Sequence, residues 1–134
     1  LKVAQADGFI KEKYGLDTKV EALGRNFSGG QRQRLTLARA LVKEAQIYIF
    51  DDSTSALDYL TEANFQKALQ EHFTDKTIIM ISQRTHSVLK ANQILVLNEG
   101  KQIGLGTHAQ LLVECPIYRE IDQSQKVAEV KEDE

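Results

Sequence analysis

Apolar residues recur at steps of three and four in three stretches of the chain, which is the spacing of an amphipathic helix. This spacing predicts helices over residues 1–13, from Ser28 to Lys43 and from Leu60 to Phe73. Ser28 is of a residue type that often caps a helix N-terminus. The apolar positions expected to face inward in the second and third helices are Leu35, Ala38, Leu41, Val42, Phe65, Leu69 and Phe73.

Short continuous apolar runs lie between these helices and are typical of strands buried on both faces of a parallel sheet. Ile47–Phe50 is one such run, and Thr77–Ser82 is another. A strand, a helix and a strand in this order imply a right-handed crossover between parallel strands. The pattern therefore places the chain in the α/β class.

The last third of the chain predicts a hairpin followed by short helices. Asn98-Glu99-Gly100 is the turn of the hairpin, Pro116 separates the two helices, and the charge-rich tail over 126–134 is expected to be disordered. The expected elements are strands over 93–97 and 101–105 and helices over 108–114 and 117–123.

Composition narrows the class of protein. With 134 residues and 42% apolar content, the chain is at most one domain and is able to bury a core. The formal net charge is -2 and the basic residues are spread out, which argues against a nucleic-acid partner. Cys115 is the single cysteine, so an internal disulfide is excluded and a cytosolic compartment is expected. No apolar run approaches the roughly 18 residues that a membrane span requires.

Ser28-Gly29-Gly30-Gln31 opens the second predicted helix and has the features of an anion site. The first N–H groups of a helix have no partner within the helix, and the helix dipole places positive charge there. The glycines would let a phosphate approach the backbone, while the Ser28 hydroxyl and the Gln31 amide would add hydrogen bonds. Taken alone, however, the motif is more often an ordinary helix cap.

Asp51 and Asp52 follow the first predicted strand directly. The carboxyl ends of parallel strands are where α/β sheets bind ligands, so Asp51 is a candidate to hold Mg²⁺ through water. The alternative is a helix cap for the segment near Ser53. Asp52 is placed to orient or deprotonate an attacking water. Ser55-Ala56-Leu57-Asp58 can equally be a loop that ends in a helix cap.

Three motifs together resemble the ABC transporter ATPase family. Phe27–Gln31 resembles its signature motif, the strand ending at Asp51 its Walker B motif, and Ser55–Asp58 its D-loop, in the family's order and spacing. Tyr14–Thr18 is similar to the stretch before the signature in exporter-type members, and Gly106–His108 resembles their C-terminal part, as does the Leu111-Leu112 pair.

The resemblance implies the C-terminal portion of a P-loop NTPase-like ABC ATPase domain. Residues 1–44 would be part of the helical subdomain with the signature helix, and residues 45–125 would run from Walker B to the C-terminal region. The phosphate loop Gly-x-x-x-x-Gly-Lys-Ser/Thr does not occur in the sequence. Because the chain also begins at Leu1 rather than at Met, we expect it to be cut from a longer protein, and the fragment alone to be inactive.

In this family two ATPase domains form a sandwich dimer around ATP and Mg²⁺. The resemblance implies that Ser28, Gly29, Gly30 and Gln31 contact ATP held by the Walker motifs of a second ABC ATPase domain. Asp51 would hold Mg²⁺ for this chain's own nucleotide. The D-loop residues that the resemblance places at the nucleotide are Ser55, Ala56, Leu57 and Asp58.

Two residues at the catalytic site depart from the family pattern. Asp52 stands where the family usually has a catalytic glutamate and is shorter by one methylene, and a 1 Å misplacement can cost roughly a hundredfold in rate. Gln83 stands where the family usually has a switch histidine, and an amide has no titratable proton near neutral pH. His86 is out of register with that histidine and is interpreted as a solvated helix residue. The two changes resemble the degenerate half of a heterodimeric exporter.

The expected function is therefore ATP binding and hydrolysis in an ABC exporter, with a heterodimeric ATPase partner and the transmembrane domains of a parent transporter. The expected location is the cytoplasmic face of a membrane. One alternative is a soluble ABC-type ATPase of DNA repair or chromosome maintenance, against which the exporter-like stretch, the Gln31 ending of the signature and the lack of coiled-coil heptads argue. Another is a non-enzymatic interaction fragment, since the phosphate loop is absent.

Overall fold

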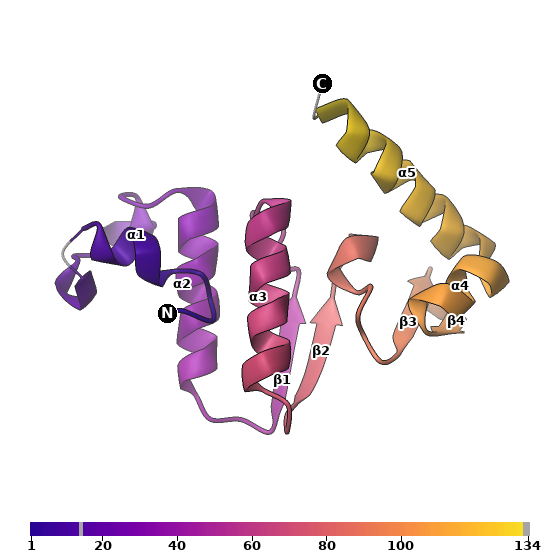
Figure 1. Ribbon diagram of the computed structural model, residues 1–134, viewed down its shortest axis with the longest axis horizontal. Helices are drawn as coiled ribbons and strands as arrows, with labels where there is room; N and C mark the ends of the chain where they lie inside the picture. The colour runs from indigo at the N-terminus through magenta and orange to yellow at the C-terminus, as the bar shows by residue number, and fades with distance from the viewer. Residues whose placement is uncertain (14, 133–134) are drawn as a thin grey trace. The chain divides into compact units, whose positions relative to one another are not determined.

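The computed structural model describes residues 1–13 and 15–132, with side chains described up to residue 126. The chain divides into two compact units, Leu1–Ile81 and Ser82–Glu134 (Figure 1). The sequence predicted at most one domain, divided near residue 44, and that division stays a prediction. Tyr14, which opens the exporter-like stretch, lies outside the described residues.

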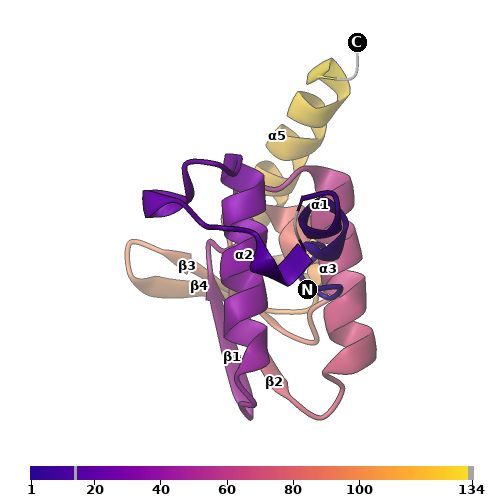
Figure 2. The ribbon, with the colours of Figure 1, turned by 90° about the vertical axis from the view of Figure 1, so that its left-hand side faces the viewer.

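The first unit is built around two parallel strands. Strand β1 pairs with β2 in a register that runs from Ile47 opposite Thr77 to Asp51 opposite Ile81. Helix α3 connects the two strands, so the predicted strand, helix and strand are confirmed. Helices α2 and α3 lie side by side in both views (Figures 1 and 2). The bounds of the elements are α1 Asp7–Lys11, α2 Gly29–Val42, β1 Ile47–Asp51, α3 Tyr59–His72 and β2 Thr77–Ile81.

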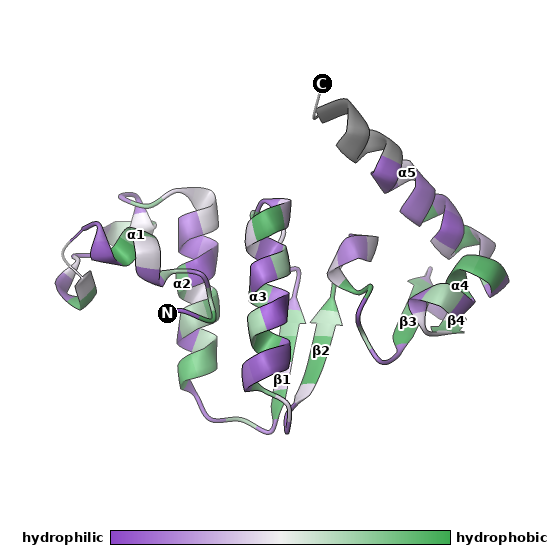
Figure 3. Ribbon diagram, in the orientation of Figure 1, coloured by the Kyte–Doolittle hydropathy of each residue, from purple (hydrophilic) through white to green (hydrophobic). Residues whose placement is uncertain are grey.

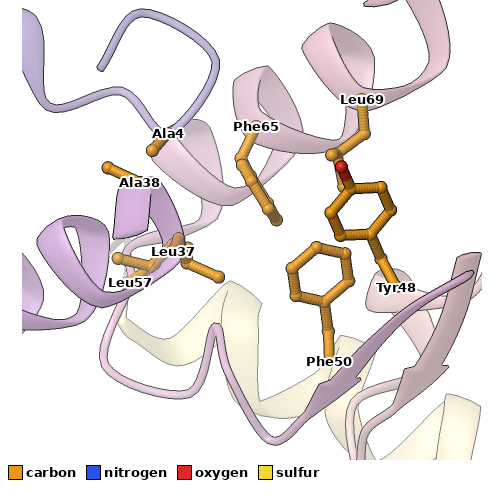
Figure 4. Packing of buried hydrophobic residues seen from close by; sticks show 8 residues of the cluster. All are labelled: Ala4, Leu37, Ala38, Tyr48, Phe50, Leu57, Phe65 and Leu69. Atoms are coloured by element: carbon orange, nitrogen blue, oxygen red, sulfur yellow. The ribbon is translucent and has the colours of Figure 1, made fainter. Parts of the chain in front are cut away.

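Aromatic residues form the centre of the first core (Figure 4). Phe65 of α3 is fully buried and meets Phe50 of β1 edge to face, with ring centroids 5.7 Å apart. Tyr48 packs against Phe73 in the same way, and its hydroxyl donates a hydrogen bond to the carbonyl of Lys43. That bond fixes the turn between α2 and β1. Phe65 and Leu69 therefore face inward as the sequence predicted.

The inward face of α2 differs from the prediction. Leu37 and Ala38 are buried and Leu41 is partly buried, but Val42 is 82% exposed. The face of α2 that packs inward contains Gly30 and Leu37, because Gly30 lies against the loop that follows β1. Helical periodicity alone did not distinguish this face from its neighbour, since Ala38 and Leu41 belong to both.

The strands are buried on one face only, so the prediction of burial on both faces is wrong for this chain. Tyr48 and Phe50 point into the core, while side chains at alternate positions point to the opposite face. Figure 3 shows apolar residues along both strands. On the uncovered face the exposed isoleucines are Ile47 (57% exposed), Ile49 (64%), Ile79 (44%) and Ile81 (50%).

The second unit is a hairpin covered by helices. Strand β3 (Ile94–Asn98) pairs antiparallel with β4 (Lys101–Gly106) through a two-residue loop. Both loop residues have positive φ, 48° at Glu99 and 73° at Gly100, as a type I′ turn requires, so the predicted hairpin is confirmed. Its core consists of Ile94, Val96, Leu111, Cys115 and Tyr118.

The last helix is longer than predicted. Helix α4 spans His108–Glu114 as expected, but α5 runs from Pro116 to Glu132 instead of ending at Gln123. No glycine or proline interrupts the sequence after Gln123, and Lys126 pairs with Asp122 one turn earlier at 2.6 Å. The helix therefore continues through most of the charge-rich tail, whose expected disorder in solution stays a prediction.

We predict that Phe65→Ala lowers the free energy of unfolding of the first unit by about 3–5 kcal/mol, because it opens a cavity among Phe50, Leu69 and Tyr48. Urea denaturation followed by far-ultraviolet circular dichroism measures the change. Gln70→Ala, on the exposed side of the same helix, is the matched control and should stay within about 0.5 kcal/mol of the wild type. An equal effect of the two substitutions would contradict the assignment of Phe65 to the core.

Candidate functional site

The N-terminus of α2 is closed by a reciprocal capping box. The Ser28 hydroxyl accepts a hydrogen bond from the Gln31 N–H at 3.2 Å, and the Gln31 side-chain oxygen accepts one from the Ser28 N–H at 3.0 Å. The carbonyl side of the Gln31 amide is therefore used within the helix, and its NH₂ group is the part that can donate to a ligand. Ser28 is exposed, so this end of the helix is accessible.

The two glycines of the motif serve different purposes. A Cβ atom at Gly29 would meet nothing within 4 Å, so the backbone here borders open space. At Gly30 a Cβ atom would lie 2.9 Å from the carbonyl oxygen of Ala56. Gly29 thus leaves room for an approaching anion, whereas Gly30 permits close packing against this chain's own loop.

Asp51, the last residue of β1, and Asp52, which follows it, lie at the carboxyl edge of the two parallel strands. Asp51 is exposed and stands opposite Ile81 in the register. Asp52 has a φ of 46°, in the left-handed region that non-glycine residues seldom adopt. Its N–H donates to the Ile81 carbonyl at 3.0 Å, which extends the strand pairing by one residue. The alternative role of Asp51 as a helix cap is wrong, because the next helix is capped by Asp58.

The loop from Ser53 to Asp58 is internally bonded. The Ser55 hydroxyl donates to the Asp52 carbonyl at 3.0 Å, and the Leu57 N–H donates to the Thr54 carbonyl at 2.9 Å. The Leu57 side chain is buried in the core, with 5% of its surface exposed. Ala56 and Ser55 remain exposed at the tip of the loop. These hydrogen bonds and the buried Leu57 side chain fix the conformation of the loop.

Two residues hold this loop that the sequence analysis did not single out. Gln33 of α2 forms hydrogen bonds to Asp52, Ser55 and Ala56. Glu62 of α3 is fully buried and accepts a hydrogen bond from the Thr54 hydroxyl at 2.7 Å. Helical spacing places Gln33 on the same face of α2 as Gly30, three residues earlier. That spacing does not indicate which loop Gln33 contacts, because the loop is distant in sequence.

Asp58 is the N-cap of α3, which confirms the simpler of the two roles considered for it. One carboxylate oxygen accepts from the Thr61 N–H at 2.9 Å and the other from the Thr61 hydroxyl at 2.7 Å. The hydrogen bonds from the Thr61 backbone and side chain lower the pKa of Asp58 below its ordinary value of 3.8. Asp58 is thus kept ionised at the start of the helix.

Gln83 belongs to the second unit, two residues beyond the end of β2, and is exposed. The Gln125 side chain of α5 donates to the Gln83 carbonyl at 2.8 Å and accepts from the Thr85 N–H at 2.8 Å. His86 lies in a short 3₁₀ turn, Thr85–Ser87, and is half-buried rather than fully solvated as expected. Helix α5 therefore fixes the backbone around Gln83.

Asp122 strengthens the same attachment. Its side chain is buried and accepts a hydrogen bond from the Thr85 hydroxyl at 3.0 Å. Burial alone would raise the pKa of Asp122, but the hydrogen bonds from Lys126 and Thr85 outweigh it, so the pKa is lowered below 3.8. The ionised carboxylate ties α5 to the segment that follows Gln83.

Within the first unit, the structure brings the Ser28–Gln31 helix start and the Asp52–Asp58 loop into contact. Among the described residues there is no group of three histidine, cysteine, aspartate or glutamate side chains that could hold a metal ion. Asp51 would therefore need water or ligand oxygens to complete the coordination of a cation. No helix in the described part of the chain is long and apolar enough to cross a membrane.

Known proteins resemble this chain over nearly its whole length. The ABC transporter family matches residues 2–55. An uncharacterised ABC transporter ATP-binding protein of Mycobacterium bovis is 47% identical over 96% of the chain, and an ATP-dependent lipid A-core flippase of Vibrio parahaemolyticus is 42% identical over 92%. The structure of a bacterial Atm1-family ABC exporter with ATP bound superimposes with a TM-score of 0.87, at 35% identity over 92% of the chain. The chain spans 22% of the length of each of these proteins.

We predict that Asp58→Ala destabilises the first unit by about 0.5–2 kcal/mol through loss of the α3 cap. Because the pKa of Asp58 is lowered on folding, its contribution is fully present above the ordinary value of 3.8 and is lost as the pH falls through the folded-state pKa. Urea denaturation at several pH values measures the difference from the wild type. Asn64→Ala, elsewhere on α3, is the control, and a pH-independent difference for Asp58→Ala would contradict the role of the ionised cap.

Proposed function

Because this chain belongs to the ABC transporter ATP-binding family, we propose that it forms part of a nucleotide-binding domain that energises an ABC exporter. The observation that carries the proposal is the contact between the helix start Ser28–Gln31 and the loop Asp52–Asp58. One element presents an anion site and the other presents carboxylates at a strand end. Relatives named as a lipid A-core flippase and an Atm1-family exporter favour the exporter class over a soluble ATPase of DNA repair.

The residues present fit ATP and Mg²⁺. The N-terminus of α2 is accessible, Gly29 borders open space, and the Gln31 NH₂ group is a possible donor to a phosphate. Asp51 is an exposed oxygen ligand at the carboxyl edge of the strands, which suits a hard cation that keeps several waters. Bound Mg²⁺ would neutralise charge on the nucleotide phosphates. In this proposal Ser28, Gly29, Gly30 and Gln31 contact the partner's ATP, while Asp51 serves the chain's own nucleotide.

The chain's own site is proposed to hydrolyse ATP slowly. Asp52 is shorter than a glutamate, and its left-handed backbone further restricts where the carboxylate can reach. Gln83 can donate a hydrogen bond but has no proton to transfer near neutral pH. These two residues would hold or orient the reacting groups poorly. The intact helix start Ser28–Gln31, by contrast, would complete a competent site on the partner.

The proposed partners are a second, non-identical ABC ATPase domain and the transmembrane domains of a parent transporter at the cytoplasmic face of a membrane. The uncovered sheet face with Ile47, Ile49, Ile79 and Ile81 supports additional polypeptide in the assembled domain, since burying each isoleucine is worth about 1.5–3 kcal/mol. The relatives are also more than four times as long as this chain, since the matched region spans 22% of each.

We predict that single-turnover ATP hydrolysis by the full transporter depends on the partner's catalytic glutamate and hardly on Asp52. Replacing the partner's glutamate should lower the rate by about a hundredfold or more, while Asp52→Asn should change it less than twofold. Rapid-quench measurement of released phosphate gives both rates. The opposite dependence would reverse the assignment of the two sites.

A second test restores the missing groups. The double substitution Asp52→Glu and Gln83→His should raise hydrolysis at this chain's own site by about tenfold or more, measured with the partner's site inactivated. Glu99→Asp, a one-methylene change in the opposite direction, and Gln102→His, both at the exposed hairpin of the second unit, form the control. An unchanged rate in the restored variant would show that something other than these two residues limits hydrolysis.

A further inference from the structure

We propose that Gln33 is a positioning residue that clamps the Asp52–Ala56 loop to the first turns of α2 and thereby couples the two ATP sites. The assignment of the helix start and the loop to two different ATP sites rests on the proposed function. The clamp itself follows from contacts within the first unit. Gln33 lies two residues beyond the Phe27–Gln31 motif, and its side chain does not have to touch ATP to act in this way.

Both ends of the Gln33 amide are used. Its oxygen accepts a hydrogen bond from the Ala56 N–H at 2.8 Å, and its NH₂ group donates to the Ser55 hydroxyl at 3.2 Å and, at a longer 3.4 Å, to the Asp52 carbonyl. Gln33 itself is half-buried, whereas the three hydrogen bonds lie at the exposed edge of the loop. Only an amide of this length offers an acceptor and a donor together, because a carboxylate lacks the donor and a lysine lacks the acceptor.

Close packing holds the same loop against α2. Gly30, one helical turn before Gln33, is where a Cβ atom would come within 2.9 Å of the Ala56 carbonyl. Leu57, the next residue of the loop, is buried in the core. The loop is therefore fixed to α2 by a steric contact at Gly30 and by hydrogen bonds at Gln33. These contacts span about twenty residues of sequence and set the distance between helix and loop.

Asp52 needs such support because its backbone is strained. A non-glycine residue in the left-handed region persists only where the surroundings determine its conformation. The Asp52 carbonyl accepts from the Ser55 hydroxyl and from Gln33, and its N–H donates to Ile81. The same Ser55 hydroxyl accepts from Gln33. Gln33 therefore helps to decide where the Asp52 carboxylate points.

The Gln33 clamp links the α2 helix start to the loop that begins with Asp52, and these two elements would serve different nucleotides. In the proposed dimer, the Ser28–Gln31 helix start contacts ATP on the partner, while Asp52 faces the chain's own ATP. Gln33 lies on α2, less than a turn after Gln31, and holds the loop that begins with Asp52. A displacement at either site would reach the other through this side chain.

The first experiment measures steady-state ATP hydrolysis by the full transporter with its partner. Gln33→Ala should lower kcat by about tenfold or more while KM for ATP stays within about twofold, because it loosens the Ser28–Gln31 helix start at the partner's competent site, where misplacement by about 1 Å affects the reaction more than binding. Gln33→Glu keeps the acceptor for the Ala56 N–H and should recover part of the rate. Gln70→Ala, an exposed glutamine on α3, is the control and should match the wild type. Equal kcat in Gln33→Ala and the wild type would overturn the positioning role.

The second experiment reports on the clamp without requiring hydrolysis. Hydrogen–deuterium exchange of the same full transporter should show about tenfold faster exchange in the peptide that contains Ala56 for Gln33→Ala, and near-normal exchange for Gln33→Glu. The core of α3 should be unaffected in both, which separates loss of the clamp from general unfolding. Unchanged exchange at Ala56 would overturn the clamp. A wild-type transporter that neither binds nor hydrolyses ATP would overturn the proposed function instead, and the exchange result would still decide on the clamp.

Discussion

The close approach of α2 to the loop after β1 is the contact on which the rest of the candidate site depends. Gly30 allows it, since any side chain there would collide with the Ala56 carbonyl, and Gln33 completes it with hydrogen bonds. The α2 face that packs against β1 follows from this contact, which is why Leu37 is buried and Val42 is exposed. The strained backbone of Asp52 is supported from the same side. Packing and site geometry thus have one common cause.

Both faces of the sheet carry apolar residues, but the helices cover only one of them. Tyr48 and Phe50 face the helices, while Ile47 and Ile49 on the same strand face outward. A strand rich in apolar residues on both faces is typical of a sheet with helices on each side. The sequence of β1 is therefore suited to a more extensive domain than the part described here.

In the second unit, the segment that contains Gln83 is held by residues far away in sequence. Gln125 and Asp122, both on α5, bind the segment from Gln83 to Thr85 through main-chain and side-chain hydrogen bonds. Buried polar groups of this kind are costly unless they are satisfied, and here each has partners. The position of the Gln83 backbone is therefore determined by a helix about forty residues away.

The sequence by itself determined the local features of this protein. Helical and strand periods, the Ser28 cap, the hairpin turn at Glu99-Gly100 and the family motifs are all encoded within short stretches, because capping and turn conformation depend on near neighbours. Only the tertiary structure decided which face of α2 is buried, why Gly30 differs from Gly29, and how Gln33, Glu62 and Gln125 hold loops. Those features depend on contacts between residues far apart in sequence, and no local period specifies which distant group a half-buried side chain will meet.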